Sequence, residues 1–351
     1  MSINALIRRV SEITYVEELQ EDEKPRIVVI GIGGAGCNAV TRMKKLGLKV
    51  PTIAINTDYN HLQIVEADKK VVLKKVTGGV GTGGDVEIGE RSALMARKEL
   101  KRLVEGVDVV FIATGLGGGT GTGVTPVMAE LARDSGALVI TIATLPFKVE
   151  KARFLKAKKG LVKIMNASNT LIVIENDKLM EVVPHLPLNK AFMVMDQLMS
   201  YTIMSFVDVV TKPSIINVDL TDLRSVMERG GLSTILISEG EISDPRGIVI
   251  DALNRPFVMD MDYSKASGAV IHVTMGENAP LSSMYMAIDA ISSFLKKEAR
   301  IIIGARIAPE FENRMRILVI LTGIKLPIVE DLIKLKGMEE KKKRMYDIDE
   351  I

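Results

Sequence analysis

The apolar residues in the first half of the chain form short, nearly continuous runs, and the stretches between these runs carry apolar residues at helical spacing. The runs predict strands at 27–30, 52–56, 71–73, 107–113, 137–143 and 170–174. The stretches between them predict helices up to residue 46 and over 86–103, 123–135 and 150–166. Strands that are apolar throughout are buried on both faces, so this alternation predicts a Rossmann-like α/β fold with a parallel sheet covered by helices.

The second half of the chain opens with one long helix, predicted over 188–210. Lys212 and Pro213 follow it, and proline cannot continue a helix. The pattern then predicts strands at 233–239, 268–274, 300–307 and 315–323, with helices over 221–229, 244–253 and 281–297. We therefore expect a second, smaller α/β domain with a mixed sheet, connected to the first domain by the long central helix.

Both ends of the chain differ from these two regions. Residues 2–20 carry apolar residues at helical spacing and predict an amphipathic helix that packs on the body of the protein. A membrane-surface role is the alternative, but the polar face of this helix mixes arginines with glutamates, which anionic lipid would repel. Residues 337–351 form a charged run typical of a solvated tail. The expected division is 1–24 for the N-terminal helix, 25–211 for the first domain with the central helix, 212–326 for the second domain and 327–351 for the tail.

Composition argues against several classes of partner. Lys and Arg total 46 against 44 Asp and Glu, and no long basic stripe occurs, so neither nucleic acid nor an anionic membrane is expected as the main partner. The single cysteine, Cys37, cannot form an internal disulfide, and no Cys or His pair has the spacing of metal ligands. No run approaches the roughly 18 apolar residues that span a bilayer, so no membrane insertion is expected. These features predict a cytoplasmic protein.

Three glycine clusters mark the candidate chemistry. The first, GIGGAG at 31–36, follows the first predicted strand, and TGLGGGTGTG at 114–123 follows the fourth. Glycines at such places let backbone N–H groups approach a phosphate at the positive end of a helix, and two such sites imply a phosphate chain held from two sides. The third cluster, GGVGTGG at 78–84, includes Thr82 and Gly83 and is predicted to close over a terminal phosphate. A flexible surface loop is the alternative for this cluster.

The first cluster alone does not identify the ligand. It matches the G-x-G-x-x-G fingerprint of dinucleotide-binding enzymes, and Asp58 lies at about the distance expected of the acid that binds a ribose. An NAD-dependent oxidoreductase is therefore a rival interpretation, although His61, His185 and His272 are isolated in the sequence and offer no evident proton donor. The clusters lack the sequence G-x-x-x-x-G-K-[ST], so a P-loop NTPase is not expected.

A set of motifs carries a more specific resemblance. The segments are 33–38, 56–58 (NTD), 117–123 (GGGTGTG), 144–147 (TLPF), 176–178 (NDK) and 217–222 (NVDLTD). In this order they resemble the FtsZ family of prokaryotic tubulin relatives, over about residues 25 to 325, and an archaeal member is implied. The GGGTGTG run is the tubulin-type signature and the most specific part. The resemblance implies a GTPase that binds GTP or GDP with Mg²⁺ and polymerises.

The resemblance also implies which residues touch the nucleotide. Its phosphates are expected on backbone donors of Gly33, Gly34, Ala35, Gly36, Cys37 and Asn38 from one side and of Gly118, Gly119, Thr120, Gly121 and Thr122 from the other. Glu150 and Arg153 are expected at the ribose and phosphates, although this segment is one residue shorter than the family pattern, and Asn176 belongs to the matching NDK motif. Phe192 and Asp196 share a helical face, so the ring would stack on the base while the carboxylate accepts two hydrogens from the guanine edge. A core aromatic is the alternative for Phe192.

The NVDLTD segment is the expected catalytic loop. From the sequence alone, Asp219 and Asp222 favour an ordinary helix cap and a first-turn acid. The resemblance implies instead that Asn217, Asp219 and Asp222 enter the nucleotide site of the next subunit and orient water toward the γ-phosphate. It further implies head-to-tail filaments, a ring at the division site and a membrane-tethering adaptor, for which residues 345–351 are a candidate ligand. A filament used for cell shape or DNA segregation is the alternative within the superfamily.

Overall fold

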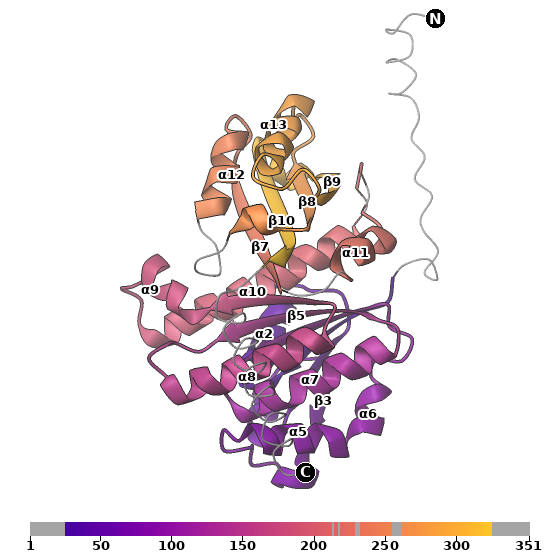
Figure 1. Ribbon diagram of the computed structural model, residues 1–351, viewed down its shortest axis with the longest axis vertical. Coiled ribbons are helices and arrows are strands. Elements are labelled where there is room, and N and C mark those ends of the chain that lie inside the picture. Colours follow the sequence, from indigo (N-terminus) through magenta and orange to yellow (C-terminus); the bar gives the residue numbers. More distant parts are fainter. Residues whose placement is uncertain (1–24, 213, 217, 229–231, 255–261, 325–351) are drawn as a thin grey trace, which may run out of the picture.

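The computed structural model describes residues 25–212, 214–216, 218–228, 232–254 and 262–324. The expected N-terminal helix, the charged tail and Asn217 lie outside this part of the chain. A single sheet runs through the described residues, with helices on its faces and a smaller, orange-to-yellow second half packed at one end (Figure 1). The α/β fold with a long central helix is confirmed.

The first half of the sheet is parallel, as the apolar runs predict. Its strands are β1 (Ile27–Ile32), β2 (Thr52–Asn56), β3 (Lys69–Val72), β4 (Val109–Gly115), β5 (Leu138–Leu145) and β6 (Thr170–Glu175), in the order β3-β2-β1-β4-β5-β6. Every residue of β1, β2, β5 and β6 is buried, because helices cover both faces. The carboxyl ends of all six strands therefore meet at one edge of the sheet.

Two groups of helices cover this sheet. The first half of the chain contains α2 (Gly33–Lys45), α3 (Tyr59–Ile64), α4 (Lys74–Thr77), α5 (Val86–Met95), α6 (Arg97–Lys101), α7 (Gly119–Asp134), α8 (Lys151–Ala167), the 3₁₀ turn Asn176–Lys178, α9 (Leu179–Val182) and α10 (Leu188–Thr211). One apolar core joins α2 and α10 to the sheet, and another joins α5, α6 and α7 to its opposite face. The single helix predicted over 86–103 is wrong in detail, because it breaks at Ala96, where no Gly or Pro signals an interruption.

The second half continues the same sheet. Its strands are β7 (Leu232–Glu241), β8 (Gly268–Met275), β9 (Arg300–Ile307) and β10 (Arg314–Ile324), and its helices are α11 (Leu220–Met227), α12 (Pro245–Asn254) and α13 (Leu281–Ser292), with 3₁₀ turns at Tyr263–Lys265 and Pro309–Phe311. β10 pairs antiparallel with β7 and β8, whereas β8 and β9 are parallel, so the mixed sheet is confirmed. Two residue pairs between β6 and β7 make one ten-stranded sheet of both halves.

A side-chain cluster also joins α10 to the second half. The guanidinium of Arg316 lies 5.1 Å from the ring centre of Tyr201 on α10 and 4.8 Å from that of Phe311. The same guanidinium donates two hydrogen bonds to Glu239 of β7, at 2.7 and 2.9 Å. Cation–π contacts and a two-pronged ion pair thus fix the second half against the central helix.

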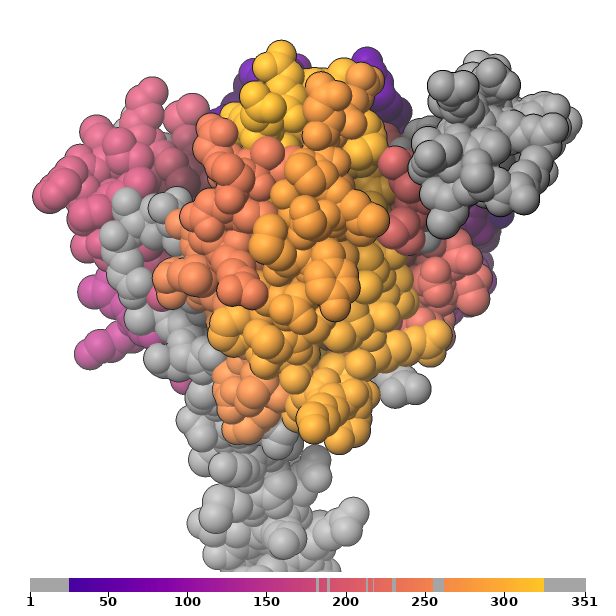
Figure 2. Space-filling view, turned by 90° about the horizontal axis from the view of Figure 1, so that it is seen from above, coloured from indigo at the N-terminus to yellow at the C-terminus, as the bar shows by residue number. Residues whose placement is uncertain are grey.

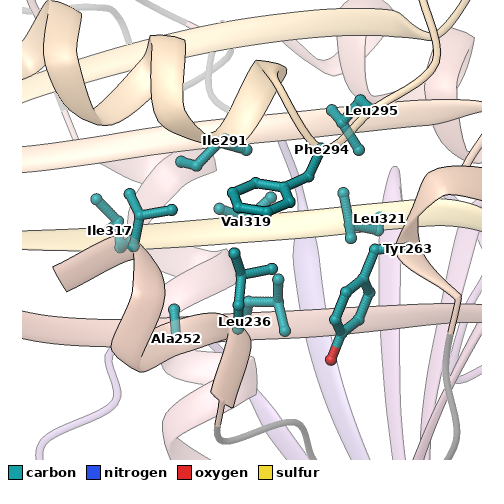
Figure 3. Close-up of a pocket in the computed structure, with 11 residues that line it drawn as sticks. Leu236, Ala252, Tyr263, Ile291, Phe294, Leu295, Ile317, Val319 and Leu321 are labelled. Atoms are coloured by element: carbon teal, nitrogen blue, oxygen red, sulfur yellow. The ribbon is translucent and has the colours of Figure 1, made fainter. Parts of the chain in front are cut away.

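A small apolar cavity lies inside the second half, between α12, α13 and the sheet (Figure 3). Phe294, Ile291 and Leu321 point into it, and Tyr263 turns its hydroxyl away from it. Its volume is about 10 Å³, at the lower limit for a single water molecule, and its lining is apolar. A cavity of this kind stays dry, so it is a packing imperfection and offers no room for a substrate.

Candidate functional site

A cleft lies at the carboxyl edge of the parallel strands. It encloses about 320 Å³, within the range of pockets that hold small ligands, roughly 300–1,000 Å³. Its walls come from the ends of β4 and β5, the first turns of α2 and α7, the start of α8 and the N-terminal half of α10. This is the place where open α/β sheets bind their ligands.

Two helix N-termini point into this cleft. Within the part of the chain that the structure describes, no side chain caps the first turn of α2 or of α7, so backbone N–H groups at both can serve a ligand. The two turns lie against each other, because a Cβ placed on Gly33 would be 3.0 Å from the backbone nitrogen of Gly121. Gly33 also has φ +71°, a conformation that favours glycine. Two positive helix ends side by side suit the binding of an anion, the use that the glycine clusters predict for them.

The glycines around this site serve different purposes. At Gly36 and Gly121 a Cβ would lie 2.1 and 2.2 Å from backbone carbonyl oxygens of β4, so these residues let the helices pack directly on the strand. At Gly34 and Gly118 a Cβ would meet nothing within 4 Å, and neither residue has a positive φ. Both line the cleft. Neither packing nor backbone conformation explains glycine there, whereas a ligand close to the backbone does.

The third glycine cluster forms one wall of the cleft. Thr82 and Gly84 line it, and a Cβ on Gly119 would lie 2.1 Å from the Thr82 hydroxyl, so the loop touches the first turn of α7. The start of the loop is held by a bridge between Asp58 and Val80. The loop thus contacts both α7 and the turn after β2.

The far end of the cleft is formed by α10 and the end of β6. Phe192 lies here, 42% exposed, with its ring edge-on to Phe147 at 6.0 Å, so the core-aromatic alternative is wrong. Asp196 lies one helical turn away, and burial raises its pKa to about 6, with an opposing effect from Arg42. Asn176 is 8% exposed, and its Oδ1 has no hydrogen-bond partner within the described chain. Two oxygen acceptors beside an aromatic ring suit the N–H edge of a purine such as guanine.

Glu150 and Arg153 line the wall between these two ends. The Arg153 guanidinium donates to the Glu150 carboxylate at 2.5 Å, and the other carboxylate oxygen accepts from the backbone N–H of Phe147 at 3.1 Å. The pair thus holds the turn that leads into α8. Among the described residues that line the cleft, Arg153 is the only one with a positive charge, and this charge is paired with Glu150.

The cleft gathers twelve of the nineteen predicted nucleotide contacts: Gly34, Ala35, Thr82, Gly118, Gly119, Thr120, Gly121, Glu150, Arg153, Asn176, Phe192 and Asp196. Gly33, Gly36, Cys37, Asn38, Asp58, Gly83 and Thr122 do not line it. The prediction missed Gly84, Gly115, Leu116, Thr144, Pro146 and Met195. Most of these residues lie in or beside the predicted motifs. The sequence did not show which residues of each motif face the cleft.

Several of the residues outside the cleft support its walls. The Cys37 thiol is buried and its pKa is raised to about 12 by burial, so it is no nucleophile. The Asp58 carboxylate caps α3, and Thr122 accepts a hydrogen bond from the N–H of Gly117 at 2.9 Å. His61 is not isolated, since its ring nitrogens lie 3.2 Å from the side chains of Asn38 and Asn56.

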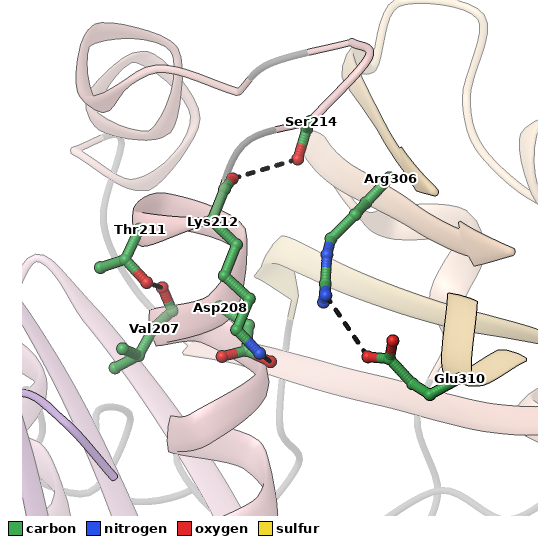
Figure 4. Close-up of polar contacts among 7 residues, drawn as sticks. All are labelled: Val207, Asp208, Thr211, Lys212, Ser214, Arg306 and Glu310. Atoms are coloured by element: carbon green, nitrogen blue, oxygen red, sulfur yellow. Dashed lines mark hydrogen bonds and ion pairs between the residues drawn. The ribbon is translucent and has the colours of Figure 1, made fainter. Parts of the chain in front are cut away.

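The predicted catalytic carboxylates lie far from this cleft. Asp219 caps α11, because its carboxylate accepts a hydrogen bond from the N–H of Asp222 at 2.6 Å. Within one chain, these acids are thus the helix cap and the first-turn acid expected from the sequence alone. At the end of α10, Lys212 pairs with Asp208 at 2.6 Å (Figure 4). Ile216 forms a bridge with Ala305 of β9. Asp219 is exposed. Among the described residues, the helix that it caps is the only hydrogen-bond partner of the Asp219 carboxylate.

The separation between the cleft and these acids follows from α10 and from the sheet. Phe192 and Thr211 are separated by about 28 Å along this helix at 1.5 Å per residue. Arg224 of α11 donates to the backbone oxygen of Gly136 at 2.8 Å, next to the start of β5, whereas the cleft lies at the end of β5. Figures 1 and 2 agree, since α9 lies on the left and α11 on the right in both views. The start of α11, with Asp222, therefore lies toward the opposite ends of α10 and β5 from the cleft.

The described residues contain no group of three or more His, Cys, Asp or Glu side chains that could hold a metal ion. Among them, no helix is long and apolar enough to span a bilayer.

Known proteins resemble both halves of the chain. Residues 26–184 match the model "Tubulin/FtsZ family, GTPase domain", and residues 235–325 match "FtsZ family, C-terminal domain". The chain is 40% identical over 326 residues to "Cell division protein FtsZ 2" of Methanocaldococcus jannaschii, covering 91% of this chain and 84% of the relative. It is 43% identical over 308 residues to "Cell division protein FtsZ 1" of Archaeoglobus fulgidus, covering 87% and 83%.

Solved structures agree with these matches. The structure "FtsZ dimer, empty (M. jannaschii)" superposes with a TM-score of 0.80 at 40% identity, covering 92% of this chain and 93% of that one. CetZ2 from Haloferax volcanii has a TM-score of 0.75 at 20% identity, covering 91% and 99%, and so shares the fold. Since relatives about 40% identical span nearly the whole chain and the two family models match its halves in order, the chain belongs to the FtsZ family of tubulin-like GTPases.

Proposed function

We propose that this protein hydrolyses GTP between head-to-tail subunits of a filament that forms the cell-division ring. The observation that carries the proposal is the distance within one subunit between the phosphate cleft and the carboxylates of Asp219 and Asp222. A second copy can place its α11 end on the cleft of the first. Contacts of this kind do not close on themselves, so they generate filaments.

Apolar side chains at both ends of the molecule support this arrangement. Val80 on the cleft loop is 85% exposed and Val149 before α8 is 82% exposed. Beside the α11 end, Ile215 is 73% exposed and Ile216 is also exposed. Exposed apolar side chains at two opposite sites suit an interface between copies. The relative of known structure described as an FtsZ dimer is a precedent for pairing in the family.

Within the cleft, each group has a defined task. The free N–H groups of α2 and α7 hold the phosphates, and the room at Gly34 and Gly118 lets the phosphates approach the backbone. Phe192 stacks on the base, and Asp196 accepts its N–H groups. Glu150 and Arg153 contact the ribose and phosphates.

Mg²⁺ fits this site through the nucleotide. The ion keeps most of its oxygen ligands from phosphates and water and needs few from protein, which agrees with a cleft that lacks a three-carboxylate cluster among its described residues. Thr82 and Thr120 line the cleft, and their side-chain oxygens are of the type that Mg²⁺ accepts, although the Thr120 hydroxyl already pairs with that of Thr57 at 2.7 Å. When bound, the ion neutralises charge that develops on the phosphates.

The neighbouring subunit supplies the remaining groups. Asp222, Asp219 and Asn217 orient water toward the terminal phosphate, which suits phosphoryl transfer because this chemistry depends on positioning and charge stabilisation. A cleft without these groups binds GTP but turns it over slowly. Hydrolysis therefore accompanies assembly.

The test uses Asp222→Ala, with Glu228→Gln at the other end of α11 as a matched control. Asp222→Ala should bind GTP with wild-type affinity, lose about 100-fold or more in phosphate release per subunit and form long-lived filaments that pellet. Glu228→Gln should behave as wild type. Mixing Asp222→Ala with a variant defective in nucleotide binding should restore turnover at the junctions where an intact loop meets an intact cleft. Loss of GTP affinity in Asp222→Ala, or wild-type turnover far below the assembly concentration, would contradict the two-subunit site.

Three further experiments distinguish the alternative functions and test the adaptor contact. Imaging of a fluorescent fusion distinguishes a division ring from a shape-determining or DNA-segregating filament. Binding of labelled GTP against NAD tests the oxidoreductase alternative. A pull-down with and without residues 338–351 tests whether this tail binds the membrane-tethering adaptor.

A further inference from the structure

A lysine from α8 reaches the glycine loop that forms one wall of the cleft. Lys156 Nζ donates a hydrogen bond to the carbonyl oxygen of Gly84 at 2.7 Å. Gly84 lines the cleft, two residues beyond Thr82, which also lines it. Lys156 follows Arg153 by one helical turn on α8. Arg153 lines the cleft itself, whereas Lys156 contacts the loop that forms its wall.

The two halves of this loop are held by different elements. The first half is tied to the turn after β2, because Tyr59 donates to the oxygen of Gly79 at 2.8 Å and Gly81 donates to that of Thr57 at 3.1 Å. The second half touches α7 through Thr82. Gly83 and Gly84 have φ +61° and +80°, and a Cβ on either would meet nothing within 4 Å. Lys156 is thus the side chain that spans from α8 to this open part of the loop.

Among the described residues that line the cleft, none offers a terminal phosphate an unpaired cation. Glu150 and Asp196 line the cleft and are acidic, and the guanidinium of Arg153 is already paired with Glu150. A triphosphate brings one more phosphate than a diphosphate, at the end away from the base. The Lys156 ammonium has three N–H donors, and one of them is used by the Gly84 oxygen. Among the described residues it has no carboxylate partner within 4.0 Å.

We propose that Lys156 determines the preference for a triphosphate over a diphosphate, by sharing its ammonium between the Gly84 oxygen and the terminal phosphate. The inference rests on the proposed function and deepens it. With a triphosphate bound, the lysine fastens the loop and the phosphate together. With a diphosphate bound, it keeps the Gly84 contact alone, and the loop wall is held more weakly.

The test compares Lys156→Met, which keeps the length of the side chain and removes the charge, with Lys156→Arg and with Lys159→Met. Lys159 lies on the same helix, is exposed and serves as the matched control. Affinities for GTP and for GDP are measured with Mg²⁺ at protein concentrations below assembly, so that no neighbour contributes. Hydrogen exchange of residues 82–84 is followed with each nucleotide.

Lys156→Met should weaken GTP binding by about 5- to 10-fold and GDP binding by less than 2-fold, the loss of one partly solvated charge-assisted hydrogen bond. It should also remove the extra protection that GTP gives to residues 82–84. Lys156→Arg should keep most of the preference, and Lys159→Met all of it. Equal effects on GTP and GDP, no effect on either, or an equal effect of Lys159→Met would overturn the inference. Failure of the wild-type protein to bind GTP would instead overturn the proposed function.

Discussion

Asp196 offers a sharp test of the cleft, because its replacement should act in opposite directions on stability and on binding. The carboxyl group lies in the cleft on α10, and burial raises its pKa from 3.8 to about 6, against a smaller opposing effect of Arg42. The ionised form is thus disfavoured in the folded nucleotide-free protein. Asp196→Asn keeps the shape of the side chain and removes the charge.

The size of the effect follows from this shift. For an acid whose pKa is raised by folding, the penalty is absent below the unfolded pKa and complete above the folded one. A shift of about two units corresponds to about 3 kcal/mol at pH 7.5 and to about 0.5 kcal/mol at pH 4. Asp196→Asn should therefore raise the free energy of unfolding by up to about 3 kcal/mol at pH 7.5, with the gain shrinking as the pH falls.

Nucleotide recognition should change in the other direction. A carboxylate accepts two N–H groups of guanine, whereas an amide offers one acceptor and one donor. Asp196→Asn should weaken GTP binding by about 100-fold or more, because one N–H group then faces another donor. Xanthine carries an oxygen where guanine carries the amino group, so the variant should bind the xanthine nucleotide better than GTP.

Urea unfolding of nucleotide-free protein at several pH values measures the first effect, and competition between GTP and the xanthine nucleotide measures the second. The other titrating groups are the same in wild type and Asp196→Asn, so they cancel in the difference between the two free energies of unfolding. Lower stability of Asp196→Asn at pH 7.5, or unchanged preference for guanine, would refute this account of the cleft.

Two further predictions concern positions whose environment differs sharply. Gly118→Ala should leave the free energy of unfolding within about 0.5 kcal/mol of wild type but weaken GTP binding. Gly121→Ala should lower the free energy of unfolding by about 1–3 kcal/mol, because its Cβ meets a β4 carbonyl at 2.2 Å. Urea titrations and GTP affinities measure these effects, and equal stability losses in the two variants would contradict the distinction. His272 is 5% exposed, and its Nε2 has no hydrogen-bond partner among the described residues. Burial lowers its pKa to about 4, so wild-type stability should fall from pH 6.5 toward pH 4 as the unfolded chain takes up the proton first. His272→Leu should lack this loss, and a pH profile parallel to wild type would exclude the group as its source.

The elements of the fold were predictable because their patterns are local. Six continuous apolar runs placed the parallel strands, and strands at Gly268–Met275 and Arg300–Ile307 lie within a residue of the predicted limits. The cap at Asp219 and the end of α10 before Pro213 also follow from single residues and their immediate neighbours. The break at Ala96 was missed, since the apolar spacing continues through it.

The sequence by itself determined which residue types stand at strand–helix junctions, and from them it predicted phosphate sites and a guanine-suited pair on one helical face. Only the tertiary structure decided which glycines face the cleft, because Gly118 and Gly121 differ in what lies beyond their missing side chains and not in local pattern. It also decided that β6 pairs with β7, and that Lys156 meets Gly84 across 72 positions of chain. Such contacts depend on how distant segments pack. A periodic pattern predicts which residues are buried but not which segment they pack against.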